Sequence, residues 1–202
     1  MKRCVILGQP NAGKTLFALQ FALYLGVLET RMAFAEARGE RCEREVRVAR
    51  AIADMTSDEP HHTRQLQSLL LELPAGKGRR AFELVDTSGL VDGIHPDPSI
   101  RLAMAQTLST AREAHVILHM IDAAAVGRTR GGPAVGEVDA QVAEFGRTRG
   151  GYLILANKMD LPEARHGLAR LRQDLRGHPI VPISALHRQG FGEVKAFVWR
   201  HL

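Results

Sequence analysis

Cysteine is scarce in this 202-residue chain, which contains only Cys4 and Cys42. Two cysteines form neither a disulfide framework nor a four-cysteine zinc site, and this favours a reducing compartment. Long hydrophobic runs are also missing, because the longest, residues 16–28, is too short to cross a bilayer and contains Gln20. The first residues lead directly into an apolar run, so we expect no secretory signal. These absences predict a cytoplasmic protein without an integral membrane segment.

Acidic residues are outnumbered by basic ones, 22 against 27, and the net charge is +5. A basic chain invites a nucleic-acid interpretation, but most of these basic residues are arginine, an excess that coding bias also produces. RNA binding is therefore one alternative among several. The 45% hydrophobic content excludes a disordered chain, and the length suits a single domain over residues 1–202.

Short apolar runs alternate with segments of helical periodicity. Strands are expected at residues 4–7, 66–73, 81–85, 116–121, 152–156 and 180–183. Helices are expected at residues 14–25, 99–112, 138–145, 163–175 and 192–201. A turn-rich link at 74–78 joins two of the strands as a hairpin. This alternation predicts a three-layer α/β fold, with helices on both faces of a mostly parallel six-stranded sheet and one antiparallel edge strand.

The segment 29–59 interrupts the alternation and is strongly charged, with eight acidic residues and six arginines. Its apolar side chains recur at helical spacing, at Cys42, Val46, Ala49 and Ala53. Acid–arginine pairs four residues apart support the same period. We therefore expect a charged helical insertion with a narrow apolar stripe, which needs burial against its own domain or against a partner.

The first chemical motif is Gly8-Gln9-Pro10-Asn11-Ala12-Gly13-Lys14-Thr15, which fits G-x-x-x-x-G-K-[ST] between an expected strand and an expected helix. Glycines let the backbone wrap an anion, and the N–H groups of the loop and of the helix N-terminus point at it. Lys14 places a positive charge on the outer phosphates, and the Thr15 hydroxyl is a ligand for Mg²⁺. The loop predicts a nucleoside triphosphate and does not identify the base.

Three further signatures each follow an expected strand: Asp86-Thr87-Ser88-Gly89, Asn157-Lys158-Met159-Asp160 and Ser184-Ala185-Leu186. Together with the phosphate loop, these D-x-x-G, N-K-x-D and S-A-x motifs resemble the translation-factor-related (TRAFAC) class of small GTPases. The resemblance is closest to the branch that contains Era, Der, the tRNA-modification GTPase and the G domain of the ferrous-iron transporter. The motifs stand in the family's order over residues 8–186. The resemblance implies a Ras-like P-loop GTPase fold for this chain, with the 29–59 insertion ahead of the first switch.

The N-K-x-D motif favours guanine for a physical reason. A carboxylate at Asp160 accepts from the ring N–H and the exocyclic amine of guanine, whereas adenine presents an unprotonated ring nitrogen there. By resemblance, Asn157 holds N7 and braces the phosphate loop, Lys158 covers the base, and the Ala185 N–H donates to the guanine carbonyl oxygen. The nucleotide-binding residues expected from the motifs are Asn11, Ala12, Gly13, Lys14, Thr15, Leu16, Asp86, Gly89, Asn157, Lys158, Asp160, Ser184, Ala185 and Leu186.

The same resemblance implies a Mg²⁺ site beside Thr15 and Asp86. It also implies that the Gly89 N–H bonds the γ-phosphate, a bond that hydrolysis breaks, which is how such loops become switches. A further Mg²⁺ ligand should be a threonine ahead of the hairpin. Thr63 is best placed because an expected strand follows it directly, and the alternatives are Thr56 and Thr30.

Catalysis is expected to rest on Lys14, Asn11 and Thr63. Many relatives carry a water-orienting glutamine after D-x-x-G, but this chain has Leu90 there, so intrinsic hydrolysis should be slow. Asn11 matches the asparagine that ligates K⁺ in potassium-activated relatives, where the cation neutralises charge between the phosphates. The alternative is that Asn11 only satisfies backbone groups of the loop.

The sequence therefore predicts a protein that binds GTP and Mg²⁺, hydrolyses GTP slowly to GDP and phosphate with K⁺ as a candidate activator, and acts as a nucleotide-dependent switch. One alternative is a GTP-dependent partner-binding module with negligible hydrolysis. The partner would be another protein or a second copy, held through the switches and the 29–59 insertion. A second alternative is an RNA-associated assembly factor.

Overall fold

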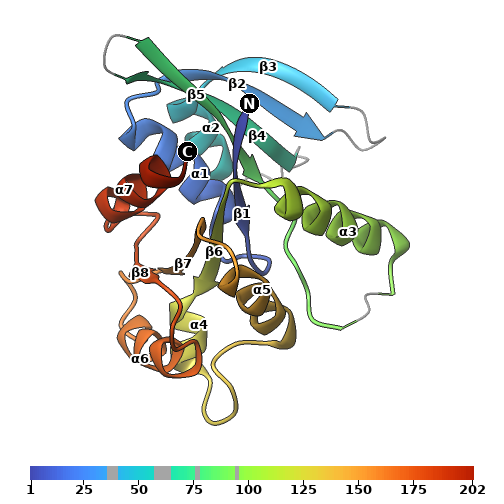
Figure 1. Ribbon diagram of the computed structural model, residues 1–202, viewed down its shortest axis with the longest axis vertical. Helices are drawn as coiled ribbons and strands as arrows, with labels where there is room; N and C mark the ends of the chain where they lie inside the picture. The colour runs from blue at the N-terminus through green and yellow to red at the C-terminus, as the bar shows by residue number, and fades with distance from the viewer. Residues whose placement is uncertain (36–40, 57–64, 76–77, 94–95) are drawn as a thin grey trace.

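A computed structural model describes residues 1–35, 41–56, 65–75, 78–93 and 96–202, and one sheet organises them (Figure 1). Its eight strands lie in the order β3-β2-β4-β5-β1-β6-β7-β8. Their bounds are β1 Lys2–Leu7, β2 Glu29–Ala35, β3 Arg41–Arg47, β4 Gln65–Ala75, β5 Gly78–Asp86, β6 Val116–Asp122, β7 Tyr152–Asn157 and β8 Ile180–Pro182. The helices are α1 Lys14–Tyr24, α2 Val48–Thr56, α3 Pro98–Glu113, α4 Ala123–Arg128, α5 Glu137–Arg147, α6 Ala164–Asp174 and α7 Phe191–His201.

Helices cover both faces of the sheet, as the burial of β1 shows. Cys4 and Ile6 belong to the apolar cluster shared with α1 and α7, whereas Val5 and Leu7 belong to the cluster shared with α3, α4, α5 and α6. Successive side chains of a strand point to opposite faces, so a continuous apolar run fits a strand buried on both sides. The structure is a three-layer Ras-like α/β fold, as predicted.

The parallel part of the sheet joins β5, β1, β6, β7 and β8. The carboxyl ends of its strands lead into the predicted motifs, because the phosphate loop follows β1, D-x-x-G follows β5 and N-K-x-D follows β7. The carboxyl ends of neighbouring parallel strands meet at one edge, where α/β proteins bind ligands. This topology brings segments 150 residues apart in the sequence to one place.

All six predicted strands are present, but the prediction of six strands with a single antiparallel edge strand was wrong. The sheet has two more strands, β2 and β3, and its antiparallel region comprises β3, β2 and β4. The β4–β5 hairpin was predicted correctly, with residues 69 and 84 in register.

The prediction of a helical insertion over 29–59 was correct only for α2. Cys42 and Val46 lie in β3, which pairs with β2 over its full length. A spacing of four residues satisfies both the 3.6-residue period of a helix and the two-residue period of a strand, so the apolar pattern did not distinguish them. The charges pair across the hairpin instead of along a helix: Arg47 Nε lies 2.8 Å from Glu29 Oε1.

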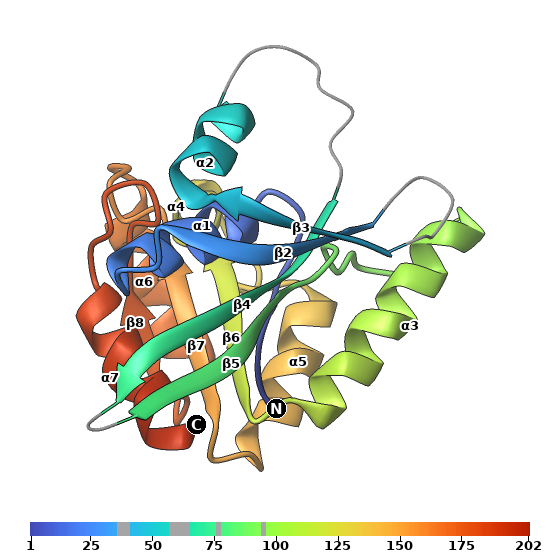
Figure 2. The ribbon, with the colours of Figure 1, turned by 90° about the horizontal axis from the view of Figure 1, so that it is seen from above.

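The helix α2 packs beside α1, and Figure 2 shows the β2–β3 hairpin lying along the outer side of β4. Val48 is fully buried, and Ala51 and Ile52 pack against the cluster that contains α1. One side of α2 is therefore covered by the chain itself, whereas Ala49 and Ala53 of the predicted apolar stripe are exposed. No helix in the described ranges is both long and apolar enough to cross a membrane.

Candidate nucleotide-binding site

The loop between β1 and α1 has a backbone that only particular residues tolerate. Gly8 has φ +140°, and a Cβ there would lie 2.1 Å from the Met120 carbonyl oxygen. Gly13 has φ +96°, and its Cβ would lie 2.5 Å from Nδ2 of Asn157. Asn11 adopts φ +61° and is exposed at the loop tip. Both glycines of the motif are thus required by close approach to neighbouring strands.

The ammonium of Lys14 is held inside this loop. Its Nζ donates to the carbonyl oxygens of Gly8 at 3.0 Å and of Gln9 at 2.8 Å. Burial lowers the pKa of Lys14, and the carboxylates of Asp86 and Asp139 oppose that shift. The loop therefore fixes a cation beside the amide groups at the start of α1, which is a favourable arrangement for an anion.

The side-chain oxygens of Asp86 and Thr15 lie together next to the loop. The Thr15 hydroxyl donates to Asp86 Oδ2 at 2.5 Å. The other oxygen, Oδ1, is buried and has no hydrogen-bond partner among the described residues. Burial raises the pKa of Asp86 to about 6, against the opposing effects of the Thr15 hydrogen bond and the Lys14 charge. An orphaned buried carboxylate oxygen beside a hydroxyl fits a hard divalent cation such as Mg²⁺.

The D-x-x-G segment is fastened to the phosphate loop. The Leu90 N–H donates to the Gly8 carbonyl oxygen at 3.1 Å, and a Cβ on Gly89 would lie 2.5 Å from Pro10 N. The Leu90 side chain is 0% exposed and packs in the apolar cluster shared with α3, α4, α5 and α6. It therefore contributes no polar group to the loop.

Asn157 connects the segments that the sequence assigns to the phosphates and to the base. Its Nδ2 donates to the Ala12 carbonyl oxygen at 2.8 Å, and its Oδ1 accepts from the Ala185 N–H at 2.9 Å. The next residue, Lys158, has φ +68°, and its Nζ lies 2.7 Å from Asp122 Oδ2. One buried amide therefore joins three of the predicted motifs.

The carboxylate of Asp160 is oriented from the S-A-x loop, because the Ser184 hydroxyl donates to its Oδ1 at 2.6 Å. Ser184 Oγ in turn accepts from the His187 N–H at 3.2 Å. Asp160 itself is exposed, and Leu186 is 54% exposed. The structure thus brings the N-K-x-D and S-A-x residues together at one rim of the site.

Thr63, the predicted switch threonine, lies outside the described residues. Of the two alternatives, Thr30 lies in β2 and its hydroxyl donates to the Leu70 carbonyl oxygen, which gives it a structural role in the sheet. Thr56 ends α2. Among the described residues, no group of three His, Cys, Asp or Glu side chains is arranged to hold a metal ion.

Sequence reasoning did not find a buried polar cluster behind the loop. Asp139, in the first turn of α5, accepts from Gln9 Nε2 at 2.9 Å through Oδ2, and its Oδ1 lies 2.9 Å from His119 Nε2. The other ring nitrogen of His119 lies 2.7 Å from the Tyr152 hydroxyl, and burial raises the pKa of that phenol. The available signal was His119 itself, a polar residue within the apolar run 116–121.

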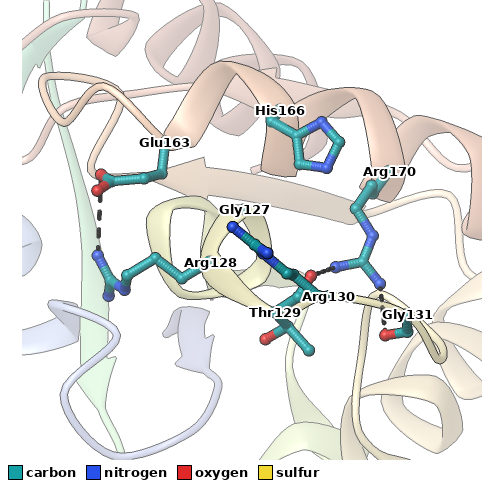
Figure 3. Close-up of a pocket in the computed structure, with 8 residues that line it drawn as sticks. All are labelled: Gly127, Arg128, Thr129, Arg130, Gly131, Glu163, His166 and Arg170. Atoms are coloured by element: carbon teal, nitrogen blue, oxygen red, sulfur yellow. Dashed lines mark hydrogen bonds and ion pairs between the residues drawn. The ribbon is translucent and has the colours of Figure 1, made fainter.

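A cavity of about 620 Å³ lies between α4, α6 and the residues that follow α4, and arginines line it (Figure 3). The guanidinium of Arg170 donates to the carbonyl oxygens of Val126 at 2.7 Å, Thr129 at 2.6 Å and Gly132 at 2.8 Å. Arg170 therefore holds the loop after α4 in place. No residue of the four motifs lines this cavity.

Comparison with known proteins agrees with this geometry. Residues 47–158 match the sequence family described as 50S ribosome-binding GTPase. The chain belongs to this GTPase family. The match confirms the resemblance to TRAFAC-class GTPases that the motifs indicated.

Curated relatives match just over half of this chain. GTPase Obg of Bacillus velezensis is 32% identical over 119 residues, which is 57% of this chain and 27% of the relative. GTPase Obg of Halalkalibacterium halodurans is 36% identical over 114 residues, or 55% of this chain and 26% of the relative. The chain spans about a quarter of the length of the curated relatives it matches.

Solved structures share the fold of this GTPase at low sequence identity. Era of Aquifex aeolicus bound to GDP·AlF₄⁻ superposes with a TM-score of 0.62 at 17% identity, over 100% of this chain and 57% of that one. The cytosolic domain of L. pneumophila FeoB superposes with a TM-score of 0.58 at 17% identity, over 99% of this chain and 70% of that one.

Proposed function

We propose that this protein binds GTP together with Mg²⁺, hydrolyses the GTP to GDP and phosphate, and acts as a nucleotide-dependent switch. The Asn157 amide carries the proposal, because it joins the phosphate loop at Ala12 to the base loop at Ala185. A site that grips both ends of a nucleotide needs such a connection between its two halves. Membership of the GTPase family supports the same conclusion.

The phosphate end rests on Lys14, Thr15 and Asp86. Lys14 would exchange its bonds to the Gly8 and Gln9 carbonyl oxygens for the outer phosphate oxygens, while the loop N–H groups hold the inner ones. The Thr15 hydroxyl and the orphaned Asp86 Oδ1 would hold Mg²⁺, which when bound neutralises charge that develops on the phosphates. Thr63 stays a predicted further ligand.

The base end rests on Asp160, with Lys158 beneath the base and the Ala185 N–H as donor to its carbonyl oxygen. The Ser184 hydroxyl holds Asp160 Oδ1, so both carboxylate oxygens can face the two N–H groups of guanine. Adenine would leave this carboxylate opposite an acceptor, at a cost of about 1–3 kcal/mol.

Calorimetry tests this selectivity. With Mg²⁺ present, GTP and GDP should bind at least tenfold more tightly than ATP, and Asp160→Ala should remove the preference. Glu144→Ala is the matched control, because this exposed acid pairs only with Arg147 among the described residues and lies on α5. Equal binding of ATP and GTP by the wild-type protein would overturn the proposal.

Hydrolysis is expected to be slow and stimulated by K⁺. The buried Leu90 provides no group to orient water. Asn11, exposed at the loop tip in the left-handed region, is the proposed K⁺ ligand. Rates measured in KCl and in NaCl, for the wild type and for Asn11→Ala, should differ only for the wild type. Equal rates in all four assays would remove K⁺ from the mechanism.

The second candidate function is a GTP-dependent binding module with negligible hydrolysis, and the buried Leu90 is the observation that favours it. Its output would be capture of a protein partner or a second copy through the switches and the 29–59 segment. Single-turnover hydrolysis distinguishes the two, since bound GTP that persists for many hours in K⁺ would favour the module.

An RNA-associated role is a further proposal, supported by the net charge of +5 and by the likeness in fold to Era, which has been solved in complex with nucleotides of 16S ribosomal RNA. Retention of RNA that falls steeply with salt concentration would support it. A cytoplasmic location also stays a prediction.

A further inference from the structure

The helix α5 takes its N-terminal cap from the D-x-x-G segment. Its own N-cap, Gly136, has no side chain, and the Val138 N–H donates instead to Asp92 Oδ1 at 2.7 Å. A Cβ on Gly136 would lie 2.1 Å from Asp92 Oδ2, so glycine permits the approach. Asp92 stands three residues after Gly89, and a carboxylate at a helix N-terminus is a stabilising partner.

The residue that follows Val138 turns inward from the same turn of α5. Asp139 is buried, and each of its carboxylate oxygens has its own partner, Gln9 Nε2 on one and His119 Nε2 on the other, both at 2.9 Å. Gln9 is the second residue of the phosphate loop, and its carbonyl oxygen accepts from Lys14 Nζ at 2.8 Å. A line of contacts therefore runs from Asp92 through the first turn of α5 to the phosphate-binding lysine.

We propose that α5 couples the segment after Gly89 to the phosphate loop, with Asp92 and Asp139 as its two positioning residues. The inference rests on the proposed function. When the γ-phosphate is bound or lost, Gly89 moves. Asp92 then shifts the capped turn of α5, and Asp139 transmits that shift to Gln9. The residues bind no nucleotide themselves; they set the geometry of the loop that does.

A shorter connection runs beside this one, because the Leu90 N–H donates directly to the Gly8 carbonyl oxygen at 3.1 Å. Any coupling measured between the two segments must be assigned to one route or the other. Asp139→Asn makes this distinction: it keeps the size of the side chain but turns one acceptor into an NH₂ group that faces a donor, either Gln9 Nε2 or His119 Nε2.

The test is a double-mutant cycle on the ratio of the Kd for GDP to the Kd for a non-hydrolysable GTP analogue. Asp92→Ala and Gln9→Ala are measured singly and together. Independent sites without shared partners give effects that multiply, whereas coupled sites deviate. We expect the double variant to deviate at least threefold from the product of the single effects. Asp92→Asn, which keeps an acceptor oxygen for Val138, should hold the wild-type ratio within twofold.

Asp97→Ala is the matched control, because Asp97 lies in the same segment but caps α3, where its Oδ1 accepts from the Ser99 N–H at 2.8 Å. Its effect should simply multiply with that of Gln9→Ala. In an Asp139→Asn background, the coupling between Asp92 and Gln9 should fall below twofold. Coupling that persists there belongs to the Leu90–Gly8 route and overturns the role of α5.

Hydrogen exchange keeps the proposal testable if Asp139→Asn fails to fold. Amides 137–141 of the wild-type protein should exchange at different rates with GDP and with the GTP analogue, and Asp92→Ala should abolish the difference. Equal exchange rates of the wild-type amides with the two nucleotides would overturn the coupling alone. Single-variant effects on the Kd ratio that simply multiply would do the same. A wild-type protein that binds neither nucleotide overturns the proposed function, and the coupling with it.

Discussion

At the scale of single residues, the buried carboxyl group of Asp86 makes a prediction about pH. Its pKa is raised to about 6 in the folded protein because burial disfavours the charge, so at pH 5 the folded state still holds a proton that the unfolded chain has released. The free energy of unfolding of the nucleotide-free protein should therefore fall as pH rises from about 4 to about 6, by up to about 3 kcal/mol.

Urea unfolding in EDTA across this pH range measures the effect. Asp86→Asn removes the titrating group, so the difference between variant and wild type isolates its contribution and should grow in favour of the variant toward pH 7. The same variant should bind GTP with Mg²⁺ more weakly, because it lacks the charged ligand. Parallel stability profiles for the two proteins would contradict the prediction.

The motif residues could be located from the sequence, since glycines, a lysine and carboxylates at fixed spacing have few other uses, and their nucleotide-binding roles stay predictions. Asn157, for example, was expected to brace the phosphate loop, and its amide lies 2.8 Å from the Ala12 carbonyl oxygen. The cluster of Asp139, Gln9 and His119 was not predictable, because its members come from three elements and no spacing along the chain relates them.

At the scale of elements, the crossing of α4 and α6 depends on two glycines. A Cβ on Gly167 would lie 1.8 Å from the Ala123 carbonyl oxygen, and one on Gly127 would lie 2.0 Å from that of Glu163. Gly167→Ala should destabilise the protein by about 1–3 kcal/mol, because overpacking outweighs the gain of about 1 kcal/mol in helix propensity.

Gly192→Ala is the control for this prediction. Gly192 lies in α7, and a Cβ there meets only the Tyr24 hydroxyl at 3.5 Å, an ordinary contact distance. Its substitution should be neutral or stabilise by up to about 1 kcal/mol. Chemical denaturation of both variants checks the pair, and equal losses of stability would show that the close crossing is not the cause.

The strands of the sheet were predictable where they are mostly apolar and buried on both faces, as in β6 and β7, because a short apolar run next to turn residues is typical of such a strand. The β2–β3 hairpin was not, since the four-residue spacing of Cys42 and Val46 fits a helix as well as a strand. Pairing with β4 decided its structure, and that pairing depends on residues distant in the sequence.

At the scale of the whole molecule, nucleotide binding should raise stability by mass action. GDP with Mg²⁺ at one hundred times its Kd should add about 2.7 kcal/mol to the free energy of unfolding. ADP at the same concentration should add less than about 1.5 kcal/mol, because adenine leaves the Asp160 carboxylate opposite an acceptor and so binds at least tenfold more weakly. Denaturant titration with each nucleotide measures both, and equal stabilisation by ADP would contradict the guanine preference.

The outer edge of β3 has a consequence for how copies of this protein meet. Its sequence, Arg-Cys-Glu-Arg-Glu-Val-Arg over residues 41–47, reads almost the same in both directions in terms of charge. If two copies joined their sheets there around a two-fold axis at Arg44, each Arg44 would face its counterpart and each Glu43 would face a Glu45. Like charges directly opposite repel, so this register disfavours the joining of two copies along β3.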